Sequence, residues 1–173
     1  MTNTPPTLEE LRQLGLTWIE NARQQLIETR QVIPVIYLGD PVDGTASVLI
    51  GIDGNIMNSP AAKQDLVTRV KKEIGEHGYM HVVTVTDSYG MEVGKEDWLK
   101  IELLRRTFNL SLPDIAKAGF GEVTETVSVF IETVTSALVL QLKYHRGPDG
   151  NVESFDPVSE LEGGQFSGRF KFF

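Results

Sequence analysis

Residues 123–155 read VTETVSVFIETVTSALVLQLKYHRGPDGNVESF, and this stretch decides the fold. Two parts of it, 123–131 and 137–144, are crowded with Val, Thr, Ile and Leu, the side chains that suit a sheet. The RGPDGN segment at 146–151 combines Pro and Gly as turns do, so residues 152–155 are expected to fold back as a hairpin partner. The stretch therefore predicts two long strands and a short third one in a largely antiparallel sheet.

Two segments that precede this stretch have the apolar spacing of amphipathic helices. Residues 8–28 follow Thr7, a suitable N-cap, and Glu10 lies three positions later, as in a capping box. Residues 60–77 begin at a Ser-Pro pair, which is typical of a helix N-terminus. Gly78 can adopt the left-handed conformation that closes this second helix. Both segments are predicted to be long helices that pack on the sheet.

The other segments complete the predicted sheet and add shorter helices. Residues 32–38 and 46–52 are β-rich runs separated by a loop with Pro and Gly, which predicts a hairpin, and a further strand is expected to start at Tyr79. Residues 95–108 fit either a helical face or the alternation of a strand, and we favour the helix. A short helix is expected at 111–118.

Together these segments predict an α+β fold. We expect a mostly antiparallel sheet of about five to six strands, packed against two longer helices (about 8–28 and 60–77) and one or two shorter ones. The length of 173 residues fits a single domain spanning 1–173, of which residues 1–6 are expected to be flexible. Residues 157–173 are rich in Gly and Phe, and we expect them to dock on the core or on a partner.

Composition and charge narrow the possible environments and partners. The absence of cysteine excludes disulfides, thiolate zinc sites and a thiol nucleophile, and it favours a cytoplasmic location. The 16 basic and 24 acidic residues give a formal net charge of −8, which repels phosphate backbones and disfavours nucleic acid as a partner. The chain has neither the start of a signal peptide nor an apolar run long enough for a membrane span, so no membrane association is expected.

The candidates for chemistry are carboxylates and one histidine. Asp87 at the end of a predicted strand and His81 near the start of the same strand are weak candidates for acid–base residues. Asp40, Asp43 and Asp53 follow β-rich runs, from which carboxylates could converge on a metal or a sugar. Asp side chains also satisfy the backbone of turns, and this interpretation is favoured for the three loop residues.

Metal, cofactor and hydrolase motifs are missing from the sequence. Glu73, Glu76, His77 and His81 lie close together, but the helix end at Gly78 interrupts the four-residue spacing that lets two histidines share a face. We therefore predict no metal site and no cofactor. The GxSxG, GxxxxGK[ST] and GxGxxG patterns do not occur.

Residues 104–131, LRRTFNLSLPDIAKAGFGEVTETVSVFI, offer a loose match to a helix-turn-helix. No Lys or Arg occurs between Lys117 and Lys143, so a recognition helix here would meet phosphate with acidic side chains only. Its β-branched content also favours a strand. A short helix followed by a strand is the preferred interpretation.

These observations favour a non-enzymatic protein-interaction or regulatory domain, which would bind a protein partner or self-associate. Phe170, Phe172 and Phe173 are candidate binding anchors, because aromatic side chains often dominate the energy of an interface. Packing of these side chains onto the domain's own core is the competing explanation. The alternative functions are a small hydrolase-type enzyme that uses loop carboxylates, with or without a metal, and a helix-turn-helix-like regulator of DNA, which the charge disfavours.

Overall fold

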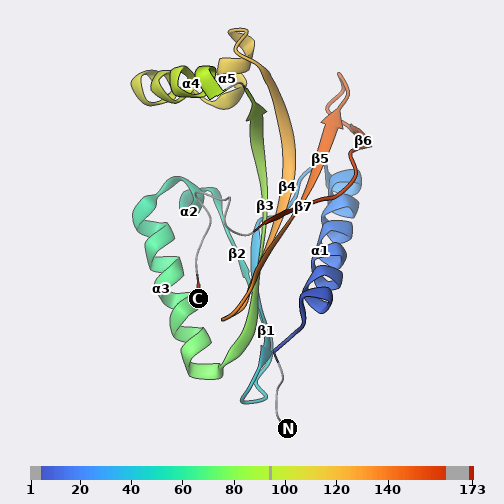
Figure 1. Cartoon of the computed structure of the whole chain (residues 1–173), viewed down its shortest axis with the longest axis vertical. Coiled ribbons are helices and arrows are strands. Elements are labelled where there is room, and N and C mark those ends of the chain that lie inside the picture. The colour runs from blue at the N-terminus through green and yellow to red at the C-terminus, as the bar shows by residue number, and fades with distance from the viewer. Residues whose placement is uncertain (1–4, 94, 163–171) are drawn as a thin grey trace.

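The computed structural model describes residues 5–93, 95–162 and 172–173. Its helices are α1 (Leu8–Thr29), α2 (Gly54–Asn58), α3 (Pro60–His77), α4 (Lys95–Phe108) and α5 (Leu112–Lys117). Its strands are β1 (Val35–Pro41), β2 (Val48–Gly51), β3 (Tyr79–Glu92), β4 (Glu122–Glu132), β5 (Ala137–Arg146), β6 (Val152–Phe155) and β7 (Ser159–Glu162). All strand pairs are antiparallel, so the predicted α+β class is confirmed (Figure 1).

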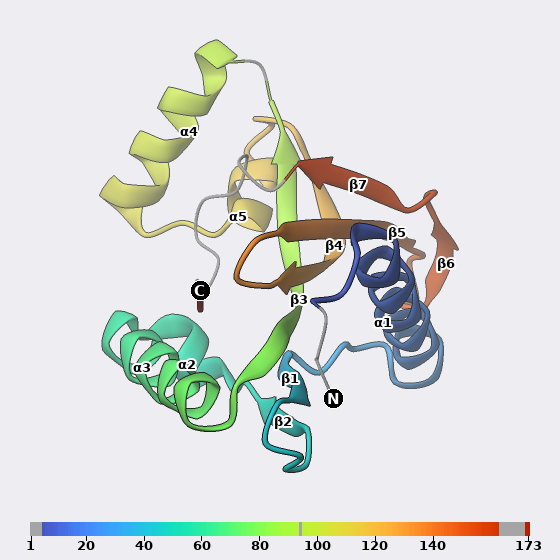
Figure 2. The same ribbon diagram turned by 60° about the horizontal axis from the view of Figure 1, so that its bottom comes forward.

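The sheet has the strand order β2-β1-β3-β4-β5-β6, and β7 also pairs with β5. The long central strands β3 and β4 pair continuously from Val82 opposite Glu132 to Glu92 opposite Glu122. Helix α1 covers one face of the sheet and α3 covers the other, while α4 and α5 lie at the far end of β3 and β4 (Figures 1 and 2).

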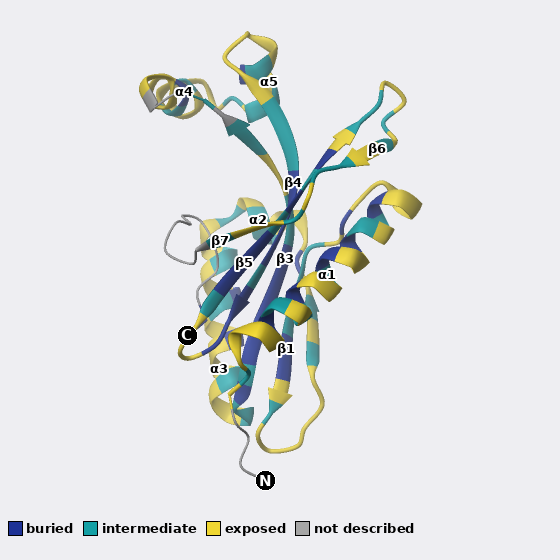
Figure 3. Ribbon diagram, turned by 45° about the vertical axis from the view of Figure 1, so that its right-hand side comes forward, coloured by how far each residue is buried: buried dark blue, intermediate teal, exposed yellow. Residues whose placement is uncertain are grey.

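Two cores fill the spaces between the sheet and these two helices, as the buried segments in Figure 3 indicate. Successive strand residues point to opposite faces, so Val83 and Val85 face α1 while Val82 faces α3. The core under α1 contains buried side chains of the helix packed on β4 and β5: Leu11, Ile19, Leu26, Val127, Val129, Leu140 and Leu142. The core under α3 contains Leu66 and Val70 of the helix with Ile36 and Leu38 of β1.

The helix ends follow the predicted capping chemistry. The Thr7 hydroxyl accepts from the backbone N–H of Glu10, whose carboxylate accepts from the backbone N–H of Thr7. Ser59 caps α3, and Gly78 closes it with φ of 65°. Residues 95–108 form the favoured helix, α4.

Two features differ from the sequence-based expectations. Residues 54–58 form a short helix, α2, that was not expected, and residues 159–162 pair with β5 as a seventh strand. The preferred interpretation of residues 111–131, a short helix followed by a strand, is confirmed by α5 and β4. The disfavoured helix-turn-helix alternative is wrong, because residues 122–132 form a central strand and cannot serve as a recognition helix.

The predicted Phe anchors fall in different environments. Phe172 is 3% exposed and belongs to the core under α3, and its backbone N–H donates to Glu132. Phe173 is 40% exposed, and Phe170 lies outside the described residues. For Phe172 the structure supports packing within the chain, the competing explanation given above.

The burial of Phe172 predicts a stability difference between two neighbouring residues. The substitution Phe172→Ala is expected to lower the free energy of unfolding by about 3 kcal/mol, because it leaves a cavity beside Ile36 and Leu38. The matched substitution Phe173→Ala is expected to cost less than about 1 kcal/mol. Urea denaturation of both variants measures this difference, and equal losses would contradict the placement of Phe172.

Candidate functional site

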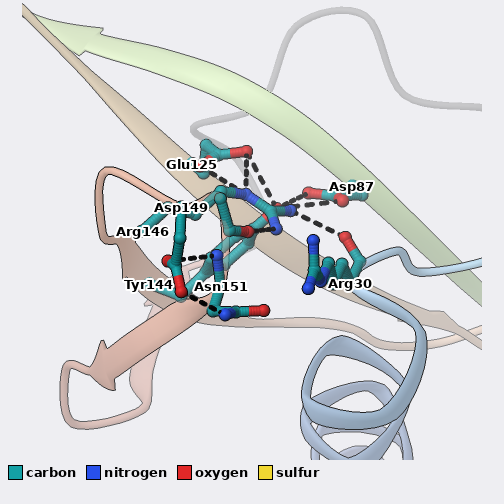
Figure 4. Close-up of polar contacts among 8 residues, drawn as sticks. Arg30, Asp87, Glu125, Tyr144, Arg146, Asp149 and Asn151 are labelled. Carbon is teal, nitrogen blue, oxygen red and sulfur yellow. Dashed lines mark hydrogen bonds and ion pairs between the residues drawn. The ribbon is translucent and has the colours of Figure 1, made fainter.

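A polar cluster lies where three strands pass the C-terminal end of α1 (Figure 4). Asp87 comes from β3, Glu125 from β4, and Tyr144 and Arg146 from β5. Glu125 lies directly opposite Tyr144, and Asp87 lies opposite Val127. Because alternate residues share a face, this register places all four side chains on the α1 face of the sheet, at the border of the apolar core to which Tyr144 belongs.

The four side chains form one hydrogen-bonded network. The Tyr144 Oη atom lies 2.9 and 3.0 Å from the two Asp87 oxygens and 3.3 Å from Oε1 of Glu125. The Arg146 Nε atom donates to both Glu125 oxygens at 3.0 Å, and Nη2 donates to Tyr144 Oη at 3.3 Å. The Arg146 guanidinium also lies over the Tyr144 ring, 5.1 Å from its centroid.

Arg146 connects this network to the surrounding backbone. Its Nη1 atom donates to the carbonyl oxygen of Gly150 in the β5–β6 turn, and its Nη2 atom donates to the carbonyl oxygen of Arg30 at the end of α1. The side chains of Arg146 and Glu125 are 23% and 21% exposed. A partly buried pair with this many hydrogen bonds is held in one orientation, so it gives the cluster a defined geometry.

The proton count of the network depends on Asp87. Burial raises the pKa of the Asp87 carboxyl, and the adjacent Glu125 carboxylate also raises it, whereas the hydrogen bond from Tyr144 and the charge of Arg146 oppose the shift. Burial and the Asp87 charge likewise raise the pKa of Tyr144, so the phenol keeps its proton. Tyr144 has a single hydroxyl proton, so it cannot donate a full hydrogen bond to both Asp87 and Glu125 at once. When Asp87 is protonated it can donate to Tyr144, which can then donate to Glu125.

A cavity of about 660 Å³ opens beside this network. Its lining combines three residues of the network with residues that follow α1 and with residues of β3, β4, α5 and the β5–β6 turn: Arg30, Gln31, Asp87, Ser88, Tyr89, Pro113, Val123, Glu125, Arg146 and Gly150. Arg30 is the C-cap of α1 and has a left-handed backbone with φ of 64°, a conformation more often taken by Gly. Among the described residues, no hydrogen bond or ion pair joins the Arg30 guanidinium to another side chain.

The other sequence candidate, His81, belongs to a separate site near the start of β3, whereas Asp87 lies in the middle of this strand. His81 lies six positions before Asp87 along the strand, which corresponds to about 20 Å. The His81 ring is 4% exposed and lines a cavity of about 360 Å³ with Tyr37 and Asp40. The structure therefore does not bring the two weak catalytic candidates together.

Close packing defines the surroundings of the His81 ring. A Cβ on Gly39, its cross-strand neighbour, would lie 2.1 Å from Nε2, so only glycine leaves room for the ring. The Nδ1 atom lies 3.4 Å from Oδ2 of Asp40, but neither ring nitrogen has hydrogen-bond geometry to a partner. Burial lowers the pKa of His81 and the Asp40 charge offsets this only in part, so the ring is neutral at pH 7.

The remaining carboxylates have local structural roles. Asp53 caps α2, and Asp43 lies 2.7 Å from Nδ1 of His77, where the contact raises the pKa of His77. Asp40, Asp43 and Asp53 thus do not gather around Asp87. Within residues 5–93, 95–162 and 172–173, no group of three or more His, Cys, Asp or Glu residues is arranged to hold a metal ion. In the same ranges, no helix has the length and apolar character of a membrane span.

The raised pKa of Asp87 predicts how one substitution changes with pH. The folded state binds the Asp87 proton more tightly than the unfolded chain does. The resulting stability is complete below the unfolded-state pKa of about 3.9 and is lost as the pH rises through the folded pKa. An Asn at position 87 does not ionise, so Asp87→Asn loses no stability in this pH range. The free energy of unfolding of the variant minus that of the native protein should therefore increase from pH 3.5 to pH 7. Urea denaturation across this range measures the difference, and a difference that falls with pH would refute the assignment.

The pKa values of His77 and His81 are shifted in opposite directions, and NMR can measure this difference directly. His77 should remain protonated to a higher pH than His81, because Asp43 stabilises the charged His77 ring whereas burial disfavours the charged His81 ring. A ¹H–¹⁵N NMR titration of the imidazole nitrogens, assigned with a His77→Gln variant, measures this order. A His81 ring that takes up its proton first on acidification would show that it is not desolvated.

Comparison of the chain with protein-family models, curated proteins and solved structures found no match. The functional assignment therefore rests on the residues and the geometry of the sites themselves.

Proposed function

We propose that this protein is a binding domain for a small polar molecule with an anionic group, and that the cavity beside Asp87, Glu125, Tyr144 and Arg146 is its binding site. The observation that carries the proposal is the 660 Å³ cavity next to a hydrogen-bonded network. Ligand sites in proteins are concave and contain a few well-placed polar groups, and this volume lies in their usual range of about 300–1,000 Å³.

The charges around the cavity favour an anionic group on the ligand. Glu125 and Arg146 neutralise each other, and burial raises the pKa of the Asp87 carboxyl. Arg30 is a lining cation without a hydrogen-bonded side-chain partner among the described residues, and its charge contributes to the lowered pKa of the nearby Asp149 carboxyl. A guanidinium can bind a carboxylate or a phosphate through two parallel hydrogen bonds, which gives orientation as well as affinity.

The rest of the lining favours a ligand that also carries hydroxyl or amide groups. Gln31, Ser88 and Tyr89 offer side-chain donors and acceptors, while Val123 and Pro113 supply apolar surface. This combination suits hydroxy acids, amino acids and sugar phosphates better than purely apolar molecules.

An acid–base enzyme is the second candidate function, and the position of Asp87 favours it. Its carboxyl has a raised pKa, lines the cavity and accepts a hydrogen bond from Tyr144, and a raised pKa at a cavity is typical of residues that exchange a proton with a bound substrate. Mass spectrometry of a ligand after incubation separates the two candidates. Recovery of the unchanged ligand supports binding, whereas conversion that is lost in Asp87→Asn supports catalysis.

The proposed site predicts which variant loses its ligand. A panel of hydroxy acids, amino acids and sugar phosphates is screened for an increase in melting temperature. A ligand at 100 times its dissociation constant adds about 2.7 kcal/mol of stability. Arg30→Gln should remove most of the stabilisation by an anionic compound, because the guanidinium that pairs with the anion is lost.

The control for this screen is Arg69→Gln, which removes an exposed cation from α3 on the opposite face of the sheet. This variant should keep the full stabilisation by the same compound. Equal losses in both variants would indicate a general charge effect, and no stabilisation by any compound in the panel would count against the proposed function.

A further inference from the structure

Helix α4 lies at the far end of β3 and β4, and much of it is exposed (Figures 1 and 3). It presents large apolar side chains to solvent. Leu99 is 73% exposed and Leu103 is 66% exposed, whereas Ile101 on another side of the helix is fully buried. The helix packs against α5, which follows it in the chain. Two leucines four residues apart lie next to each other on a helix, so they form a continuous apolar contact surface.

Charged residues flank the two leucines on the same face. Glu96, Leu99, Leu103 and Arg106 are spaced by three, four and three residues, which is the spacing of the contact positions in a coiled coil. Glu96 and Arg106 are both exposed, and Arg106 contacts Glu102 of its own helix at 2.9 Å. The exposed face therefore has an acidic N-terminal end, an apolar centre and a basic C-terminal end. We call these four residues the α4 stripe.

We propose that the α4 stripe binds the α4 stripe of a second copy of this chain, with the two helices antiparallel. A two-fold axis between Leu99 and Leu103 brings Leu99 of each chain against Leu103 of the other. The same operation brings Glu96 of each chain against Arg106 of the other. The interface is self-complementary, as an interface with two-fold symmetry must be.

Charge complementarity selects this occupant and this direction. In a parallel pair, Glu96 would face Glu96 and Arg106 would face Arg106, and both contacts would be repulsive. The antiparallel pair turns both contacts into attractive ones and keeps the two leucine contacts at its centre. A helix of 14 residues offers only a small area, so we expect a weak dimer that forms with rising protein concentration.

The experiment uses full-length protein and measures mass by sedimentation equilibrium over a range of concentrations. The native chain should show a monomer–dimer equilibrium. Leu103→Ser should raise the dissociation constant of the dimer at least tenfold. The control, Ile27→Ser, removes an apolar side chain of similar exposure from α1 and should leave the dissociation constant unchanged. A native chain that stays monomeric, or a dimer that Leu103→Ser does not weaken, would overturn the proposal.

A charge exchange tests the antiparallel register. Glu96→Arg and Arg106→Glu should each weaken the dimer at least tenfold, because each creates two like-charge contacts across the two-fold axis. An equimolar mixture of the two variants should restore dimerisation, since the chain with two arginines then faces the chain with two glutamates. Far-UV circular dichroism checks that each variant keeps its helices. Failure of the mixture to form a heterodimer, when each variant alone is folded and monomeric, would overturn the antiparallel arrangement.

Discussion

The uninterrupted pairing of β3 with β4 is the constraint on which the rest of the structure depends. It runs over eleven residue pairs, from Val82 with Glu132 to Glu92 with Glu122. Their central part carries the core under α1, whereas the start of β3 contributes Tyr79 and Val82 to the core under α3. Beyond the cores they reach past α1 to the polar cluster and then to α4. The register of this one pair therefore positions the cavity and the projecting helix.

The polar cluster combines a stability cost with a defined geometry. Partly burying Asp87 and Glu125 requires loss of hydration, which is offset only if each oxygen finds a donor. Arg146 and Tyr144 supply those donors. The Arg146 guanidinium also donates hydrogen bonds to the backbone carbonyl oxygens of Arg30 and Gly150. A well-packed apolar cluster of the same size could be equally stable. The retention of this network at the edge of a cavity is consistent with binding, which needs fixed polar groups.

Much of the fold could be predicted from the sequence because it is encoded locally. The capping residues Thr7 and Gly78 mark helix ends through backbone chemistry that involves only a few neighbours. The β-branched runs of β4 and β5 likewise show their own preference. Strand β7 was missed because its four residues, SELE, are half acidic and lack that composition. It forms through pairing with β5 and through the contact of Arg12 with Glu160, which is a long-range interaction.

The site was less accessible from sequence than the fold. Asp87 was selected as the last residue of a predicted strand, but Glu125, Tyr144, Arg146 and Arg30 were not. Their proximity depends on the pairing register of the strands, and a shift of one residue in that register moves every side chain of a strand to the other face. The strand predicted to end at residue 131 ends at Glu132, which pairs with Ala137 and so brings Glu125 opposite Tyr144.

The edges of the sheet influence how copies of this chain can meet. Strands β2, β6 and β7 each contain four residues, and together they form the borders of the sheet in the described part of the chain. Two of them divide the free side of β5, so neither border offers a long row of unpaired backbone groups. Long open edges are the usual starting points for aggregation through added strands. Short borders disfavour this non-specific addition of strands. Copies of the chain are then expected to associate through contacts between side chains.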